Sequence, residues 1–213
     1  MEYKETIKEA EKLARILIQK KARKSIGIYY FIWGFYELYI TLAFTILYSL
    51  NVTNVAIDYL LYFAVTIPLY YTFKLFRDIN WEYIVFKYKT KDLEKVKKQF
   101  NIENAINAIL ILVAILVFLI IIPHITTNEI IALGSVYVFI GLVMYSLYIS
   151  IYSKYRIVEP RYYDLLAMIS FPFMAPVMAG LLSFLVSFLI AMLVAMAWLY
   201  AGFRSILEVS EIE

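Results

Sequence analysis

Residues 26–50 decide the fold class, because they read IGIYYFIWGFYELYITLAFTILYSL with a single charged side chain, Glu37. A helix needs about 20 mostly apolar residues to cross the hydrocarbon layer of a membrane. The run therefore predicts a transmembrane helix over Ile26–Leu50, and similar runs recur along the chain.

The composition of the whole chain favours the same class. Of 213 residues, 63% are hydrophobic and 17% are charged, whereas a soluble domain carries about a quarter charged residues. We therefore expect an all-α, polytopic integral membrane protein that uses the lipid bilayer as part of its solvent. The chain has no cysteine, which excludes disulfides and thiolate chemistry. A net charge of +3 gives no indication of nucleic-acid binding.

We predict a bundle of six transmembrane helices. The last two share one apolar stretch, in which Pro172, Pro176 and Gly180 are places to bend or break. A hairpin is one interpretation, and a kinked span with a re-entrant segment is the other. The predicted spans are Ile26–Leu50, Val55–Phe76, Asn104–Pro123, Glu129–Tyr152, Tyr163–Gly180 and Leu181–Phe203.

The lysines and arginines all lie on one side of this arrangement. Eight precede the first span, eight lie from Lys74 to Lys98, three lie from Lys154 to Arg161, and Arg204 follows the last span, which accounts for all 20. Because basic residues favour cytoplasmic loops, we predict a multi-pass protein of the cell (plasma) membrane with both termini in the cytoplasm. The charged N-terminus does not resemble a cleavable signal peptide, so we expect the first span to be retained.

Aromatic residues cluster near the inner ends of the predicted spans. Tyr29, Tyr30 and Trp33 lie there in the first span, and Tyr152 and Tyr163 lie there in later ones. Such rings favour the membrane interface, because the ring is apolar and its polar atom stays wet. We expect these residues to anchor the helices at that depth.

Residues 1–25 precede a membrane domain of residues 26–203, and residues 204–213 form a short cytoplasmic tail. The N-terminal segment has an amphipathic helical pattern, which predicts an interfacial helix along the inner leaflet. A helix that packs on a partner protein is the alternative. The residues on its apolar face are Tyr3, Ile7, Ala10, Ala14 and Leu17.

The largest cytoplasmic segment is residues 77–103. Its first part is apolar from Trp81 to Phe86, which indicates that the second span continues as a helix into the interface. A second, short helix is predicted over Asp92–Phe100, capped by Thr90 or Asp92. This helix either docks into a groove on a cytoplasmic partner or lies on the membrane. Its candidate partner-coupling residues are Asp92, Leu93, Lys95, Val96, Lys97, Lys98 and Phe100.

Glu37 is the candidate for chemistry inside the membrane, where a carboxylate is expensive and usually marks function. It lies on one face with Gly34, Thr41, Thr45 and Tyr48, and we expect this stripe to face the bundle interior. No basic residue lies at that depth, so we expect Glu37 to carry its proton. It either couples protons or contacts substrate, or it holds helices together by hydrogen bonds. The candidate site residues are Glu37, Thr41, Thr45, Tyr62, Thr66 and Tyr145.

Small residues recur every four positions in the sixth span. Such a ridge lets another helix approach closely, either within the bundle or across a homodimer. The fourth span has a related face with Gly134 and Gly141. The helix-packing candidates are Ala179, Ser183, Ser187, Ala191 and Ala195.

No motif predicts an enzyme. His124 is the only histidine, so a His-rich metal site is excluded. The chain also has no HExxH, no GxSxG and no Gly-rich phosphate loop. We therefore expect no catalytic residue, no metal and no cofactor.

The layout resembles the membrane subunits of ABC transporters of the ABC-2 exporter type. The features that carry this resemblance are the helix of residues 2–24, the six spans, the inside termini and the Asp92–Phe100 segment. It implies a transport subunit, a permease whose ATPase is a separate chain. Two other functions stay open: a structural or accessory subunit of a larger membrane complex, and a proton-coupled carrier or channel that uses Glu37.

Overall fold

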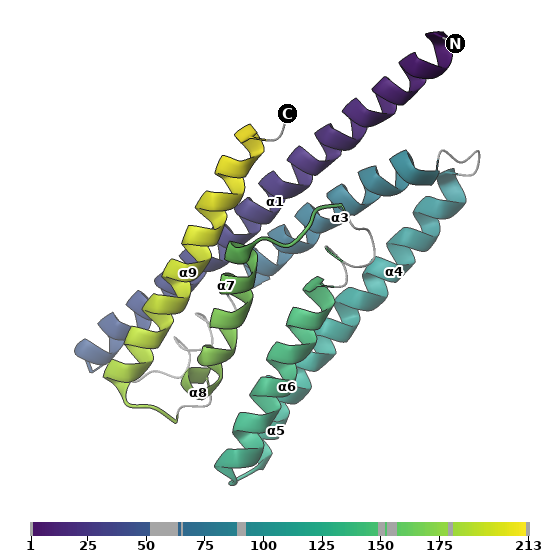
Figure 1. Ribbon diagram of the computed structural model, residues 1–213. Helices are drawn as coiled ribbons and strands as arrows, with labels where there is room; N and C mark the ends of the chain where they lie inside the picture. Colours follow the sequence, from purple (N-terminus) through teal and green to yellow (C-terminus); the bar gives the residue numbers. More distant parts are fainter. Residues whose placement is uncertain are drawn as a thin grey trace.

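The computed structural model describes the chain apart from residues 1, 52–63, 65, 89–92, 149–151, 153–156, 179–180 and 212–213. The described residues form helices and no strand, which confirms the all-α prediction (Figure 1). Three helical stretches are long and apolar enough to cross a membrane, in agreement with a membrane bundle: Glu5–Ser49, Leu93–Phe118 and Phe184–Glu211. Two shorter apolar stretches are Glu129–Tyr145 and Tyr162–Val177. The first part of the predicted second span Val55–Phe76, residues 55–63 and 65, falls outside the described residues.

The first helix, α1, runs without a break over Glu2–Ser49. The sequence suggested a boundary near residue 25, between an interfacial helix and the first span. The change from charged to apolar residues there does not interrupt the backbone, since the chain has neither proline nor a helix-ending glycine motif at that point. The N-terminal third of α1 instead continues the axis of the helix past the rest of the bundle (Figure 1).

Helix α3 covers Thr66–Tyr88, so the second span does continue as a helix through Trp81 and Phe86, as predicted. Helix α4 covers Leu93–Ala114. The prediction of a separate short helix over Asp92–Phe100 is therefore wrong for its described part, because Leu93–Phe100 is the first third of a longer helix. Asp92 lies outside the described residues.

Helix α4 passes directly into a π-helical segment, Ile115–Ile121. The wider π turn changes the backbone hydrogen-bond pattern within an apolar helix. The Ser135 hydroxyl shares its one proton between two carbonyl oxygens, that of Phe118 at 2.9 Å and that of Ala132 at 2.7 Å. A buried serine on the following helix thus binds a carbonyl of the irregular segment. The short helix α5, Ile122–Ile125, follows the π-helical segment. Residues 126–128 then form the turn that leads into the next helix.

Helix α6 covers Glu129–Tyr148, beginning at the predicted residue. The Asn128 side-chain oxygen accepts a hydrogen bond from the backbone N–H of Ile130 at 2.9 Å, which satisfies one of the free donors at the helix start. Together α4, α5 and α6 make an antiparallel hairpin (Figure 1).

The last apolar stretch breaks where the prolines predicted. Helix α7, Tyr162–Ser170, passes into a 3-10 segment, Phe171–Met174, and a short helix α8, Ala175–Met178. Helix α9 follows over Phe184–Glu211, which extends the predicted sixth span by two turns. Figure 1 shows α7 and α9 antiparallel, as the hairpin interpretation requires.

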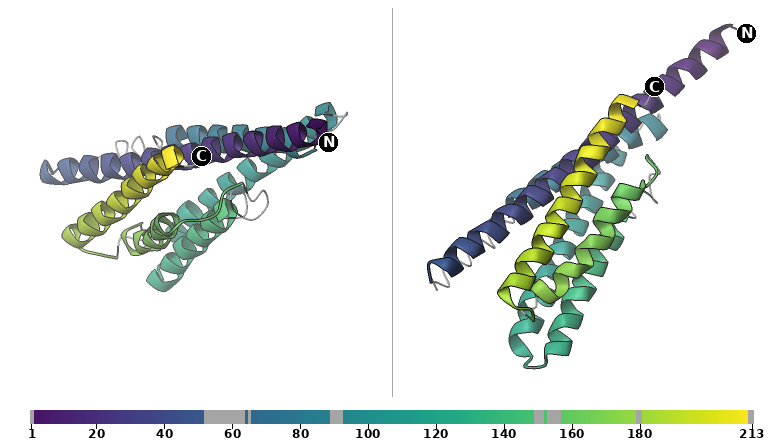
Figure 2. Two further views of the ribbon diagram at one scale, coloured as in Figure 1. Left: turned by 45° about the horizontal axis from the view of Figure 1, so that its top comes forward. Right: turned by 60° about the vertical axis from the view of Figure 1, so that its left-hand side comes forward.

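Helix α1 packs mainly against α9 and also against α3, while α7 and α8 lie between α9 and the α4–α6 hairpin (Figure 2). Helices α1 and α9 approach closely at three glycines, two on α1 and one on α9. A Cβ added to Gly202 would lie 3.0 Å from the carbonyl oxygen of Gly27, and one added to Gly34 would lie 2.9 Å from the Leu199 side chain. The missing side chains thus allow the two helices to touch at their backbones.

The inner-end aromatic residues form the core of this contact. Tyr29, Tyr30 and Trp198 are each 3–5% exposed, and the ring of Trp198 lies 5.7 Å from both tyrosine rings. The ring of Phe171 lies 5.5 Å from that of Trp198. Tyr29 and Tyr30 therefore pack inside the protein, where we had expected anchors that face the membrane interface. Edge-to-face and tilted aromatic pairs of this kind stabilise beyond their buried area.

Candidate functional site

A buried ion-pair network joins α1, α7 and α9 at the charged end of the bundle. Arg23 lies on α1 one turn before Gly27, Asp164 lies in the first turn of α7, and Glu208 lies near the end of α9. The side chains of Arg23 and Asp164 are 2% and 0% exposed, and that of Glu208 is 15% exposed. Charges so deeply buried are rare unless they are paired and hydrogen-bonded.

Arg23 makes the central contacts of this network. Its Nη1 donates to Asp164 Oδ2 at 2.7 Å, and its Nη2 donates to the carbonyl oxygen of Glu159 at 2.7 Å. Its Nε lies 3.2 Å from Glu208 Oε2, and its guanidinium carbon lies 5.5 Å from the centre of the Tyr163 ring. All three guanidinium nitrogens of Arg23 therefore have a partner, on α7, on α9 and on the segment before α7.

Arg161 closes the network from the start of α7. Its backbone N–H donates to Asp164 Oδ2 at 2.7 Å, and its Nε donates to Glu208 Oε1 at 2.9 Å. The hydroxyl of Tyr163 donates to Glu208 Oε2. Asp164 suits this position at the N-terminus of α7, because its carboxylate lies in the first turn and accepts from the residue that caps the helix.

The four charges of the network balance. Arg23 and Arg161 supply two positive charges, and Asp164 and Glu208 supply two negative ones. Balanced pairing lowers the cost of burying them and fixes the three helices relative to one another. The arrangement therefore has a structural role: it holds α1, α7 and α9 together where they meet. Within the described ranges, no group of three or more His, Cys, Asp or Glu residues is placed to hold a metal ion.

Sequence reasoning missed this network. Arg23 was counted only as a sign of the cytoplasmic side, and Glu208 was not singled out. Arg23 and Asp164 are 141 positions apart, and no spacing rule connects residues at such a distance. The available signal was the position of each charge, since Arg23, Asp164 and Glu208 all stand within a turn or two of an apolar segment.

Glu37 lies half-buried on the apolar part of α1. Within the part of the chain that the structure describes, its carboxyl group has no ion pair and no hydrogen bond. Thr41 on the same face is 8% exposed, and the Thr45 hydroxyl donates to the Thr41 carbonyl oxygen at 2.7 Å. Gly34 faces α9, whereas Tyr48 is 64% exposed with its ring stacked 4.3 Å from that of Phe184. The stripe thus runs along the edge of the α1–α9 contact and faces the interior in part.

The other predicted members of the Glu37 site are not gathered around it. Tyr145 is 64% exposed on α6, a helix that packs mainly on α5, α8 and the π-helical segment. Thr66 is the first residue of α3 and is exposed. Tyr62 lies outside the described residues. Of the six candidates, the structure brings together Glu37, Thr41 and Thr45, all on one helix.

The predicted partner-coupling residues lie on the first turns of α4. Lys95, Lys97 and Lys98 are exposed. The apolar face is partly used by the chain itself, because Phe100 is 5% exposed and its ring lies 5.7 Å from that of Trp81 on α3. Leu93 is 40% exposed, and Val96 is half-buried. The three lysines and Leu93 therefore lie on the surface, whereas Phe100 is covered by α3.

The predicted helix-packing stripe contributes to the bundle in its second half. Ala191 and Ala195 are 4% and 1% exposed on the buried face of α9. Ser187 is half-buried, and Ser183 is exposed just before the helix begins. Ala179 lies outside the described residues. At Gly134 and Gly141, by contrast, an added Cβ would meet no described atom within 4 Å, so no close helix packing occurs there.

Comparison with known proteins adds no further constraint to this geometry: no family model, no curated protein and no solved structure matches the chain.

Proposed function

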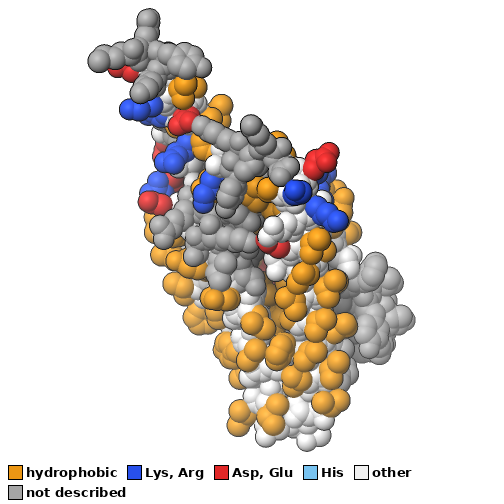
Figure 3. All heavy atoms as spheres, turned by 90° about the vertical axis from the view of Figure 1, so that its right-hand side faces the viewer, with side chains coloured by type: hydrophobic (Ala, Val, Ile, Leu, Met, Phe, Trp, Pro, Cys, Tyr) orange, Lys and Arg blue, Asp and Glu red, His pale blue; other side chains and the backbone are white. Residues whose placement is uncertain are grey.

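We propose that this chain is the membrane-embedded subunit of a transport complex, and that a separate cytoplasmic ATPase docks on its charged end. The observation that carries the proposal is the separation of charge along the bundle. Figure 3 shows acidic and basic side chains gathered toward one end of the visible face and an apolar surface over the rest. An apolar body suits lipid and other membrane subunits, and a charged end suits a soluble partner.

The chain ends and the α3–α4 corner support a docking role for this charged end. Both ends of the described chain lie there, together with the end of α3 and the start of α4 (Figure 1). In a plasma-membrane protein that follows the positive-inside rule, this end is the cytoplasmic one. A partner that binds here contacts several helices at once.

Exposed groups on α1 and α4 fit a protein partner. Leu13 and Leu17 on the projecting part of α1 are 62% and 67% exposed among charged neighbours. Such apolar residues outside the bundle favour burial against another chain. On α4, the exposed Lys95, Lys97 and Lys98 offer a basic surface for an acidic groove. In this proposal the start of α4 takes the place of a separate coupling helix.

The test is the effect of charge reversal on association. The tagged chain is extracted in mild detergent, and every protein that co-purifies is quantified by mass spectrometry and assayed for ATPase activity. We expect a stoichiometric nucleotide-binding protein with the natural chain and its loss in the K95E/K97E/K98E variant. The K95R/K97R/K98R variant is the matched control, because it keeps the charge and should keep the partner.

Two results would overturn the proposal. Co-purification of other membrane proteins without any ATPase would indicate a structural or accessory subunit. Isolation of the chain alone, or as a homo-oligomer, would favour a self-sufficient carrier.

One observation, the position of Glu37, favours the second candidate function, a proton-coupled carrier. It is an unpartnered carboxyl group, among the described residues, on a helix long enough to cross the membrane. Ionisable groups at membrane depth mark the proton relays of pumps and transporters. Proton flux into liposomes that contain the purified chain would be lost in E37Q and retained in E129Q, since Glu129 is exposed at the start of α6. Equal flux in E37Q and the natural chain would remove this function.

A further inference from the structure

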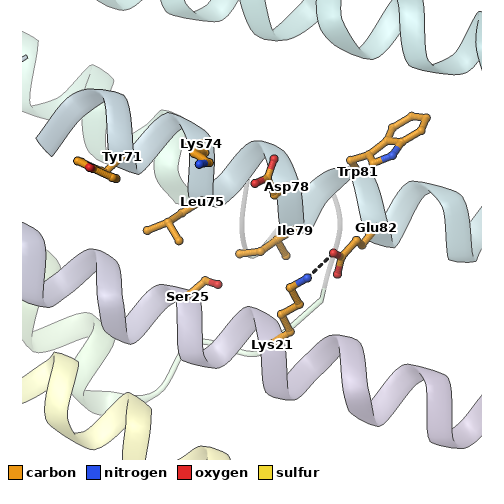
Figure 4. A pocket seen from close by; sticks show the side chains of 9 residues that line it. All are labelled: Lys21, Ser25, Tyr71, Lys74, Leu75, Asp78, Ile79, Trp81 and Glu82. Atoms are coloured by element: carbon orange, nitrogen blue, oxygen red, sulfur yellow. Dashed lines mark hydrogen bonds and ion pairs between the residues drawn. The ribbon is translucent and has the colours of Figure 1, made fainter. Parts of the chain in front are cut away.

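A groove between α1 and α3 lies at the level where the charged end of the bundle meets its apolar part. Its volume is about 420 Å³, which is the size of a small-ligand site. Figure 4 shows Leu75 and Ile79 pointing from α3 toward α1, and Lys21 reaching from α1 to Glu82. Ser25, also on the groove wall, directly precedes the first apolar span at Ile26. In a membrane, the groove therefore opens among lipid headgroups.

Lys74 is the basic residue of this groove that pairs with no described residue. Lys21 forms an ion pair with Glu82, and Arg77 lies 3.4 Å from Asp78. Lys74 lines the same groove and has no ion pair or hydrogen bond with any described residue. The lining residues carry two positive charges, on Lys21 and Lys74, and two negative charges, on Asp78 and Glu82. Because Lys21 is paired with Glu82 and Asp78 with Arg77, the charge left for a ligand is that of Lys74. Lys74 is thus matched to one negatively charged group of a ligand.

The face of α3 that contains Lys74 is apolar and aromatic on one side of the lysine, so it matches a phospholipid with an apolar chain and a charged headgroup. Ile67, Tyr70 and Tyr71 stand seven, four and three positions before Lys74, so they share its face toward the apolar end of the helix. They are 61%, 64% and 51% exposed. On the other side of Lys74, Trp81 lines the groove one turn beyond Asp78. A phospholipid whose acyl chain lies along Ile67, Tyr70 and Tyr71 would have its phosphate at Lys74.

We propose that this groove binds the headgroup of an anionic phospholipid whose phosphate pairs with Lys74 and whose hydroxyl groups donate to Asp78. Phosphatidylglycerol has this chemistry, with one negative charge and a glycerol at its end. Asp78 has an exposed and weak pairing with Arg77, so its carboxylate can accept hydrogen bonds from such a headgroup. Phosphatidylcholine lacks both the net charge and the hydroxyl donors. Basic pockets between helices on the cytoplasmic side are a recognised mode of binding acidic lipids.

The test is lipid binding to the delipidated chain in detergent, followed by native mass spectrometry. Phosphatidylglycerol and phosphatidylcholine with the same acyl chains are compared. We expect tighter binding of phosphatidylglycerol, and about fivefold weaker binding of it by K74Q, the effect of one basic residue near a membrane surface. K74R should bind as the natural chain does. K87Q is the matched control, since Lys87 lies on the same helix outside the groove.

A free phosphate compound is the other source of the same chemistry. Glycerol 3-phosphate added in excess should leave lipid binding unchanged; full displacement would overturn the assignment to a lipid. Equal binding of the two lipids, or equal weakening in K74Q and K87Q, would overturn the proposal itself. The inference rests on insertion of the chain in a membrane. It does not depend on the ATPase partner, because lipid binding and co-purification of a partner are measured in separate experiments and can fail separately.

Discussion

Arg23→Met removes the cation that holds the buried network together. Met fills part of the space of the arginine stem but leaves the carboxylate of Asp164, 0% exposed, with the backbone N–H of Arg161 as its remaining donor among the described residues. Glu208 keeps Arg161 and Tyr163. The carbonyl oxygen of Glu159 also loses its 2.7 Å donor.

The magnitude follows from this count. Removing one member of a buried ion pair destabilises a protein by about 3–5 kcal/mol, because the other charge stays buried and unpaired. An exposed pair contributes about 0–1 kcal/mol. Arg77→Met is therefore the control, since Arg77 and Asp78 are about half exposed and 3.4 Å apart. We expect Arg23→Met to lower the free energy of unfolding several times more than Arg77→Met does.

Unfolding in mixed micelles, with increasing sodium dodecyl sulfate and detection by tryptophan fluorescence, measures this difference. Trp198 is 5% exposed in the α1–α9 contact, so its emission reports separation of these helices. A loss below about 1 kcal/mol for Arg23→Met, equal to that of Arg77→Met, would refute the view that the network fixes the helix junction.

Three further predictions use the same unfolding assay. Gly202→Ala should destabilise the bundle by about 1–3 kcal/mol, because the new Cβ would lie 3.0 Å from the Gly27 carbonyl oxygen; Gly141→Ala, where an added Cβ meets no described atom within 4 Å, is the control and should not destabilise. Ser135→Ala should cost about 0.6–1.7 kcal/mol, since the Phe118 carbonyl loses a hydrogen bond between helices; no loss would mean that this carbonyl finds another donor. Glu37→Gln should leave the unfolding midpoint unchanged, because the described structure gives this carboxyl group no partner, and a clear destabilisation would reveal a structural hydrogen bond instead.

Local features of the chain were predictable from sequence. The start of α6 at Glu129 and the break between α7 and α9 follow from asparagine capping and from two prolines, signals that act within a few residues. The length of the apolar runs predicted helices of membrane-spanning length, and three such helices are present among the described residues.

Two kinds of feature escaped prediction, for different reasons. A helix does not end where its polarity changes, so α1 and α4 continue through boundaries that the charge pattern suggested. Contacts between distant helices carry no signature in a single sequence. The Gly27–Gly202 approach and the Arg23–Asp164 pair depend on which helices are neighbours and how they are rotated. The same limitation explains why Tyr145, a plausible partner for Glu37 by depth, lies on a helix that packs elsewhere.

The unbroken helix α1 has a mechanical consequence. Its 48 residues correspond to about 72 Å of rigid rod, more than twice the thickness of the hydrocarbon layer. Residues 2–20 alone extend for about 28 Å, so a tilt of about 10° around Arg23 would move the N-terminal tip by about 5 Å. The buried network thus lies at the point around which α1 would tilt. A force applied to the N-terminal tip would reach Glu37 along a single continuous helix.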